Sequence, residues 1–174
     1  LTTRVPTGAA PFCLAVNPVT NKVYVANHNG TEVTVIHGAT NDTTSIPTGP
    51  YPAIIAVNPL TGKVYVANWA STTVTVIDGA TGAAETVRVG SAPYGVALNP
   101  VTNKVYVANS MDSTVTVIDG ATNTTTTLAA GSGPWNVAVN TVTNRIYVAN
   151  RNSNSVTVID GTTNQTTTVP VGTQ

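Results

Sequence analysis

The chain has 174 residues, of which 41% are hydrophobic and only 8% are charged, and its seven basic side chains balance its seven acidic ones. This balance excludes the basic field that nucleic-acid binding requires, and the hydrophobic content excludes a disordered chain. The one cysteine, Cys13, leaves no pair for an intrachain disulfide or a zinc cluster, and the apolar runs are too short for insertion into a membrane as a helix.

The first elements along the chain set a pattern that the rest repeats. TTRV at 2–5 is typical of a short outer strand, and NKVYVANHNGTEVTVIHG at 21–38 predicts two more strands, because Val, Thr and Tyr are frequent and no helical period is present. The tetrapeptide YVAN then recurs without an insertion or deletion at 24–27, 65–68, 106–109 and 147–150. The chain is therefore one repeat domain over 1–174, with repeats 1–41, 42–82, 83–123 and 124–164 and the start of a fifth at 165–174.

Each repeat contains four predicted strands, which we name A to D by their order within one sheet. In the third repeat, strand D is 85–89, strand A is 94–98, strand B is 104–109 and strand C is 114–119. One position of the A–B turn holds Asn21, Gly62, Asn103 and Asn144, and one position of the C–D turn holds Asn41, Gly82, Asn123 and Asn164. Asn and Gly exchange where φ is positive, so both turns are predicted to be tight hairpins with a left-handed residue.

The polarity of the four strands predicts how the sheets are arranged. Strand A is small and apolar, strand B has apolar residues on both faces, strand C mixes Val and Ile with Thr, and strand D is rich in Thr. The four-stranded antiparallel blades of a β-propeller give this order, because neighbours cover both faces of each blade and only its outer edge is solvated. A β-sandwich or a β-solenoid is the less favoured alternative, since a sandwich alternates more cleanly between apolar and polar residues.

The segments NPVTNKVYVAN and TVTVIDGATN resemble the YVTN family of β-propeller repeats, and the resemblance covers the whole chain, four times over. All four copies read YVAN, with Ala in place of Thr, a small change that leaves the expected fold intact. The resemblance implies a surface-layer-type, secreted or envelope protein of archaea or bacteria. Family members are often binding or scaffold modules, and propellers near this family include some enzymes, but no catalytic motif belongs to the repeat itself.

The number of strands bears on how a ring would close. A Thr-rich strand D is predicted at 2–5 and again at 166–169, so the four repeats carry one extra outer strand. Propellers have about 4 to 8 blades, and the rings of this family are usually larger than four. We therefore expect part of a larger propeller, or a ring completed by self-association, for which two copies would supply eight blades with two-fold symmetry, or a higher assembly.

Charged residues at repeated positions have structural explanations. An Asp-Gly pair at the end of strand C is more typical of a tight turn than of a ring of carboxylates, and basic residues at the start of strand B are interpreted as solvated charges that discourage edge pairing. The acidic series is Asp78, Asp119 and Asp160, with His37 in the first repeat, and the basic series is Lys22, Lys63, Lys104 and Arg145. Neither His28 nor His37 belongs to a nucleophile motif. We predict no catalytic residue, no metal site and no cofactor.

The loops that differ between repeats are the candidate contact face. A meander brings the B–C and D–A loops to one edge of the ring, where aromatic and polar side chains on a rigid scaffold form binding sites. The alternative is that strand A residues plug the axis or pack between blades. The candidates for binding a protein or a carbohydrate are Phe12, His28, Tyr51, Trp69, Tyr94, Trp135 and Arg151, with Met111 beside them.

Four N-x-S/T sequons predict glycosylation, which would also keep a charge-poor protein soluble. The alternative is that a turn Asn before a Thr-rich strand forms sequons by coincidence. The candidates are Asn29, Asn41, Asn123 and Asn164.

Three functions remain open at this point. The first is a non-enzymatic extracellular or cell-surface scaffold for binding, adhesion or envelope assembly. The second is a fragment of a propeller lyase or redox enzyme that uses the same face. The third is an engineered or recently amplified self-assembling repeat. An enzyme predicts a central cleft with convergent polar groups, whereas a scaffold predicts a plugged axis and contacts between chains.

Overall fold

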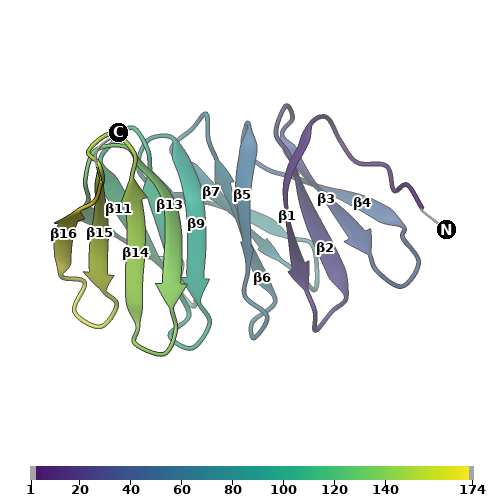
Figure 1. Cartoon of the computed structure of the whole chain (residues 1–174). Helices are drawn as coiled ribbons and strands as arrows, with labels where there is room; N and C mark the ends of the chain where they lie inside the picture. The colour runs from purple at the N-terminus through teal and green to yellow at the C-terminus, as the bar shows by residue number, and fades with distance from the viewer. Residues whose placement is uncertain (1–2, 173–174) are drawn as a thin grey trace.

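The computed structural model describes residues 3–172, which form sixteen strands in four antiparallel sheets of four (Figure 1). Each sheet is a meander in which strands that follow one another in the chain pair with each other. The sheets, which we name blades 1 to 4, lie side by side in chain order, as predicted for a β-propeller. No helix in the described part of the chain is long and apolar enough to span a membrane.

The strand bounds repeat from blade to blade. Blade 1 contains β1 (Pro11–Asn17), β2 (Lys22–Asn27), β3 (Glu32–His37) and β4 (Thr43–Pro47). Blade 2 contains β5 (Pro52–Val57), β6 (Lys63–Asn68), β7 (Thr73–Asp78) and β8 (Ala84–Arg88). Blade 3 contains β9 (Pro93–Asn99), β10 (Lys104–Asn109), β11 (Thr114–Asp119) and β12 (Thr125–Ala129). Blade 4 contains β13 (Pro134–Asn140), β14 (Arg145–Asn150), β15 (Ser155–Asp160) and β16 (Thr166–Pro170).

The blades are offset from the sequence repeats by one strand. Strand D of each repeat pairs with strand C of the repeat before it, so that β16 completes blade 4. Residues 3–5 of the predicted opening strand form no strand, and Thr2 lies outside the described residues. The physical reason is that a strand D needs a strand C as its hydrogen-bonding neighbour, and β15, the strand C of blade 4, is already paired with β16.

Both predicted hairpin turns are confirmed by their backbone conformation. In the A–B turn, φ is 52° at Asn21, 75° at Gly62, 53° at Asn103 and 51° at Asn144. In the C–D turn, φ is 63° at Asn41, 78° at Gly82, 59° at Asn123 and 61° at Asn164. Asn tolerates this region better than other side chains, and Gly adopts it freely, which explains why only these two residue types occur there.

The core lies between blades, where two different apolar faces meet. The Tyr face of a blade carries the Tyr and Ala of YVAN with aliphatic residues of strands C and D, which in blade 1 are Tyr24, Ala26, Val33, Val35 and Ile46. The Val face carries aliphatic residues of strands A, B and C, which in blade 2 are Ile55, Val64, Val66 and Ile77. These two sets form one buried cluster, and equivalent clusters join blades 2 and 3 and blades 3 and 4. Burial of such side chains contributes about 1.5–3 kcal/mol each, so the junctions provide much of the stability.

The two outermost faces of the described structure are exposed. Leu14 on the Val face of blade 1 is 62% exposed, whereas its equivalent Ile55 in blade 2 is 6% exposed. Tyr147 on the Tyr face of blade 4 is 41% exposed, whereas Tyr65 is fully buried. Blades 1 and 4 therefore form the ends of an open arc, as Figure 1 shows.

Candidate functional site

A buried polar network fixes the loops that carry the variable residues. In blade 2, the Asn68 side chain donates to the Thr75 hydroxyl at 3.0 Å, and the backbone amide of Gly49 donates to the same hydroxyl at 3.2 Å. A Cβ on Gly49 would lie 2.6 Å from Asn68 Nδ2, so only glycine fits against this amide. The last residue of YVAN thus holds the start of the D–A loop, and equivalent bonds occur in blades 1 and 4.

A second contact ties the two variable loops together in every blade. The first residue of the B–C loop donates its backbone amide to a left-handed residue of the D–A loop. The pairs are His28 to Ala10 at 2.9 Å, Trp69 to Tyr51 at 3.0 Å, Ser110 to Ala92 at 3.0 Å and Arg151 to Gly133 at 2.9 Å. A repeated backbone frame therefore presents a different side chain in each blade.

The structure brings all seven predicted contact residues together in one connected group, which we call the aromatic surface. The ring centroid of His28 lies 5.0 Å from that of Phe12, 5.7 Å from that of Tyr51 and 5.8 Å from that of Trp69. The Phe12 and Tyr94 centroids are 6.4 Å apart, although the two residues belong to blades 1 and 3. Tyr94 stacks on Trp135 at 4.0 Å, and the guanidinium of Arg151 lies 5.3 Å from the centroid of Trp135. Such pairs stabilise the arrangement of the rings beyond their burial alone.

The aromatic surface combines features of both sequence interpretations. Strand A residues from different blades contact each other, as a plug would require, and Ala53 at the same position is fully buried. Phe12 is nevertheless 52% exposed and Tyr51 is 45% exposed, and the other rings are partly buried. The rings therefore pack side by side and still present part of their area to solvent.

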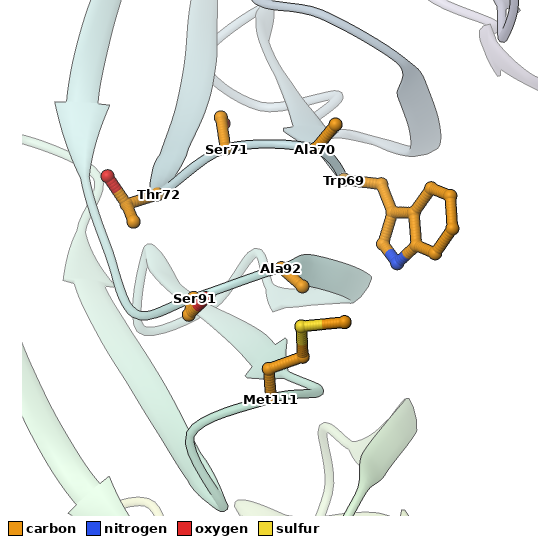
Figure 2. A pocket seen from close by; sticks show the side chains of 7 residues that line it. All are labelled: Trp69, Ala70, Ser71, Thr72, Ser91, Ala92 and Met111. Atoms are coloured by element: carbon orange, nitrogen blue, oxygen red, sulfur yellow. The ribbon is translucent and has the colours of Figure 1, made fainter.

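Two clefts open on this surface between blades 2, 3 and 4. The larger has a volume of ≈ 360 Å³ and is lined by Trp69, Ala70, Ser71, Thr72, Ser91, Ala92 and Met111. In Figure 2 the side chains of Trp69 and Met111 extend to the same side of this cleft. The smaller cleft, of ≈ 180 Å³, shares Trp69 and Met111 and adds Ser110, Gly133, Trp135, Arg151 and Asn152. Trp69 and Met111 thus line both clefts, whereas Ser91 lines only the larger cleft and Arg151 only the smaller one.

Sequence reasoning missed the polar side chains that shape these clefts. The Ser71 hydroxyl donates to the Asn68 carbonyl at 2.8 Å, and a carboxylate oxygen of Asp112 accepts from the backbone amide of Ser91. Both bonds fix loop backbone beside the larger cleft. The signal available in the sequence was that Ser71 and Asp112 share one variable position of the B–C loop, which holds Gly30 in the first repeat and Ser153 in the fourth.

The repeated aspartates form turns at the opposite edge of the blades, as predicted. Asp78 Oδ1 accepts from the backbone amides of Ala80 and Thr81, both at 2.9 Å, and Asp119 and Asp160 make equivalent bonds. These hydrogen bonds lower the pKa of all three carboxyl groups, because they favour the charged form. No three His, Cys, Asp or Glu side chains among residues 3–172 lie close enough to hold a metal ion.

The interpretation of the basic series as solvated edge charges is wrong for the three lysines. Their Nζ atoms donate to backbone carbonyls of the next blade, from Lys22 to Gly79 at 2.6 Å, from Lys63 to Gly120 at 2.8 Å and from Lys104 to Gly161 at 3.0 Å. Each lysine therefore links two blades, because its long stem reaches across the junction. Arg145, in blade 4, instead lies 3.6 Å from Asp160 of its own blade.

The sequon residues differ in their environments. Asn29 and Asn41 are exposed. Asn123 is partly buried and donates its side-chain amide to Glu85, and Asn164 is also partly buried. Asn41, Asn123 and Asn164 have a left-handed backbone, which explains the choice of Asn at these positions without glycosylation. Glycosylation therefore stays a prediction, and Asn29 and Asn41 are its most accessible positions.

Comparison with known proteins shows the fold. No protein-family model and no curated protein matches the chain. The chain is similar to the solved structure of Kuenenia stuttgartiensis hydrazine synthase, with a TM-score of 0.82 and 22% identity over 97% of this chain and 52% of that one. It is also similar to U3-55K, with a TM-score of 0.81 and 18% identity over 98% of this chain and 55% of that one.

A third similar structure is a functionally unknown protein from Desulfotomaculum acetoxidans, with a TM-score of 0.74 and 16% identity over 91% of this chain and 55% of that one. The chain thus spans about half the length of each of these structures. Likeness at these identities carries the fold alone, and membership of the YVTN family stays a prediction. The chain has the fold of a partial β-propeller with four blades.

Proposed function

We propose that the chain is a non-enzymatic binding scaffold of the extracellular space or cell surface, and that its aromatic surface contacts a carbohydrate. The observation that carries the proposal is the connected group of rings and the two clefts on a face whose loops differ between repeats. The opposite edge keeps the same turns in every blade. Variation is thus concentrated where contact with a ligand is possible.

The chemistry of the clefts favours a saccharide. Trp69 and Met111 offer apolar area between the two clefts, which suits the C–H face of a sugar ring. Arg151 and Asn152 line the smaller cleft and supply donors for hydroxyl groups or for the carboxylate of an acidic sugar. A shallow apolar cleft with a few polar groups is typical of sites that orient a small ligand. A protein ligand on the same face is the second outcome that a binding experiment would detect.

The experiment is a titration of the wild-type chain with a panel of neutral and acidic oligosaccharides, followed by tryptophan fluorescence and calorimetry. We expect Trp69→Ala to weaken saccharide binding at least about tenfold, since large aromatic side chains dominate the binding energy of such sites, and to lower the unfolding midpoint only slightly, since the ring is partly exposed. Val142→Ala is the matched control, because Val142 is 93% exposed at an A–B turn on the other edge. Loss of stability in Trp69→Ala with no saccharide bound by the wild type would favour the plug.

The enzyme alternative uses the same clefts and differs in one measurable respect. A propeller lyase or redox enzyme would convert a bound saccharide, whereas a scaffold returns it unchanged. Mass analysis of each bound oligosaccharide after prolonged incubation separates the two. The alternative of a self-assembling repeat draws support from the four identical YVAN copies, and it predicts assembly without any ligand.

A further inference from the structure

The two exposed faces of the arc carry apolar side chains at the positions whose equivalents pack together inside it. The Val face of blade 1 has Leu14, Val23, Val25 and Ile36 where blade 2 has Ile55, Val64, Val66 and Ile77. The Tyr face of blade 4 has Tyr147, Ala149, Val156, Val158 and Val169 where blade 2 has Tyr65, Ala67, Val74, Val76 and Val87. Leu14 and Val16 are 62% and 51% exposed on the first face, and Tyr147 and Val169 are 41% and 45% exposed on the second.

Polar links across the internal junctions recur at fixed sequence separations. The side-chain amide of Asn58 donates to Asn103 at 2.9 Å and that of Asn99 donates to Asn144 at 2.9 Å, each 45 residues further along. The lysine-to-glycine links described above each span 57 residues. These separations predict which residues would meet if blade 4 were followed by another blade 1.

The predicted partners are present in the chain. In a fifth blade, the acceptor for Asn140 would lie 45 residues further along the chain. Moved back by four repeats of 41 residues, that position is Asn21 of blade 1, which has the residue type and the left-handed backbone of Asn103 and Asn144. A count of 57 residues from Arg145 leads in the same way to Gly38. The link is missing at one internal junction, because Gly62 stands where Asn17 needs an acceptor, and the buried Asn17 side-chain amide has no partner among the described residues.

We propose that the Tyr face of blade 4 binds the Val face of blade 1 of a second copy of this chain, and that two such junctions close a ring of eight blades. Asn140 donates to Asn21 of the other copy, Arg145 to the carbonyl of Gly38, and Tyr147 and Leu14 become buried. The three internal junctions are three examples of this contact, since the same faces meet in each.

The occupant is a second copy because repetition makes the two faces complementary. Both faces belong to every chain, so the contact is head-to-tail, and a head-to-tail contact either closes or grows into a filament. Two copies give eight blades, within the usual range of about 4 to 8, whereas three copies would exceed it. The junction between copies also differs from the internal junctions at two positions. Blade 4 contributes Arg145 where the other blades have Lys, and blade 1 contributes His37 where the other blades have Asp.

Paired cysteines test the predicted contact directly. In a Cys13→Ser background, the variant Asn21→Cys with Asn140→Cys is expected to oxidise to a covalent dimer of twice the chain mass. The matched control is Asn99→Cys with Asn144→Cys, in which Asn99 corresponds to Asn140 and Asn144 corresponds to Asn21. Asn144 has the same left-handed backbone as Asn21, and the control pair is expected to oxidise within one chain. Oxidation of the control alone would overturn the proposal, and a ladder of larger species would overturn closure by two copies.

Charged substitutions test the faces without cysteine chemistry. The native mass of the wild-type chain is expected to be that of a dimer, and Leu14→Asp and Tyr147→Glu are each expected to weaken association at least about a hundredfold, since each puts a carboxylate into a closed apolar contact. Leu60→Asp is the control, because Leu60 is 72% exposed in an A–B turn. A monomeric wild type, or variants that fold and remain dimeric, would overturn the proposal. If Leu14→Asp fails to fold, Tyr147→Glu and the cysteine pair decide the question.

Discussion

Tyr51 is the only aromatic residue with a left-handed backbone in residues 3–172, with a φ of 51°. Such a conformation costs a residue other than Gly roughly 1–3 kcal/mol, and it persists where its surroundings determine it. Here the Tyr51 carbonyl accepts from Trp69 and its ring contacts His28, so the conformation places a half-exposed ring on the aromatic surface. Ala10 and Ala92 have nearly the same φ at the equivalent positions, so the repeated loop frame imposes the conformation, and the Tyr at this position adds a ring to the surface.

We predict that Tyr51→Gly raises the free energy of unfolding by about 0.5–1 kcal/mol, because Gly adopts a positive φ without strain. The same change is expected to weaken saccharide binding, since it removes a ring. Ala92→Gly is the matched control, with the same φ of 51° and no ring. Urea denaturation and the saccharide titration measure the two effects. Lower stability in both variants would show that the backbone is not strained.

Tyr65 represents a different balance, in which a buried ring carries an unpaired hydroxyl. Its side chain is fully buried, and its hydroxyl has no hydrogen-bond partner among the described residues. Burial, followed by the charges of Asp119 and Glu85, raises the pKa of Tyr65 to about 12. This value exceeds the pKa of about 10 that Tyr has in an unfolded chain. The contribution of this pKa difference to the free energy of unfolding is therefore fully present below pH ~10 and is lost as the pH rises toward 12.

We therefore predict that Tyr65→Phe leaves the free energy of unfolding at pH 7 unchanged or raises it by up to about 1 kcal/mol, since it removes an unsatisfied buried group. Between pH ~10 and ~12 the variant is expected to lose stability less steeply than the wild type. Urea denaturation at pH 7, 9 and 11 checks both statements. A variant that is less stable at pH 7 by more than about 1 kcal/mol would show that the hydroxyl is satisfied in solution.

At the scale of elements, the strands and turns were predictable because the same pattern of residues recurs in four repeats of 41 residues. The apolar residues on both faces of strand B and the exchange of Asn with Gly in the turns are local signals, and the structure confirms both. The links from Lys22 to Gly79 and their equivalents were not predictable, because they depend on the distance between blades, which no single repeat encodes. The same holds for the contact of Phe12 with Tyr94 across two junctions.

The A–B turn of blade 3 gives a prediction at this scale. Asn103 combines a φ of 53° with an acceptor role for Asn58 across the junction. Asn103→Val is expected to lower the free energy of unfolding by about 2–4 kcal/mol, because a β-branched side chain is strained there and the donor of Asn58 loses its partner. Asn103→Gly keeps the turn and loses only the hydrogen bond, so a cost of about 1–2 kcal/mol is expected in urea denaturation. Equal costs for the two variants would contradict the role of the backbone conformation.

At the scale of the whole molecule, stability follows from a row of similar junctions. A repeat array is stabilised by each unit and by its contacts with neighbours, so a blade covered on one face is less stable than a blade covered on both. Blades 2 and 3 are covered on both faces, and blades 1 and 4 on one each. The exposure of Leu14 and Tyr147 therefore marks the parts of the arc that open first when no second copy is bound.

Amide hydrogen exchange of the Leu14→Asp variant provides the corresponding prediction. With the ring open, the amides of β2 and β14 are expected to exchange faster than those of β6 and β10, although all four strands are central in their sheets. In the wild type the difference is expected to shrink, because a second copy covers the outer faces and local opening then requires separation of the copies. Uniform exchange in the Leu14→Asp variant would show that the junctions do not set local stability. An unchanged difference between outer and inner blades in the wild type would instead show that the outer faces remain uncovered in solution.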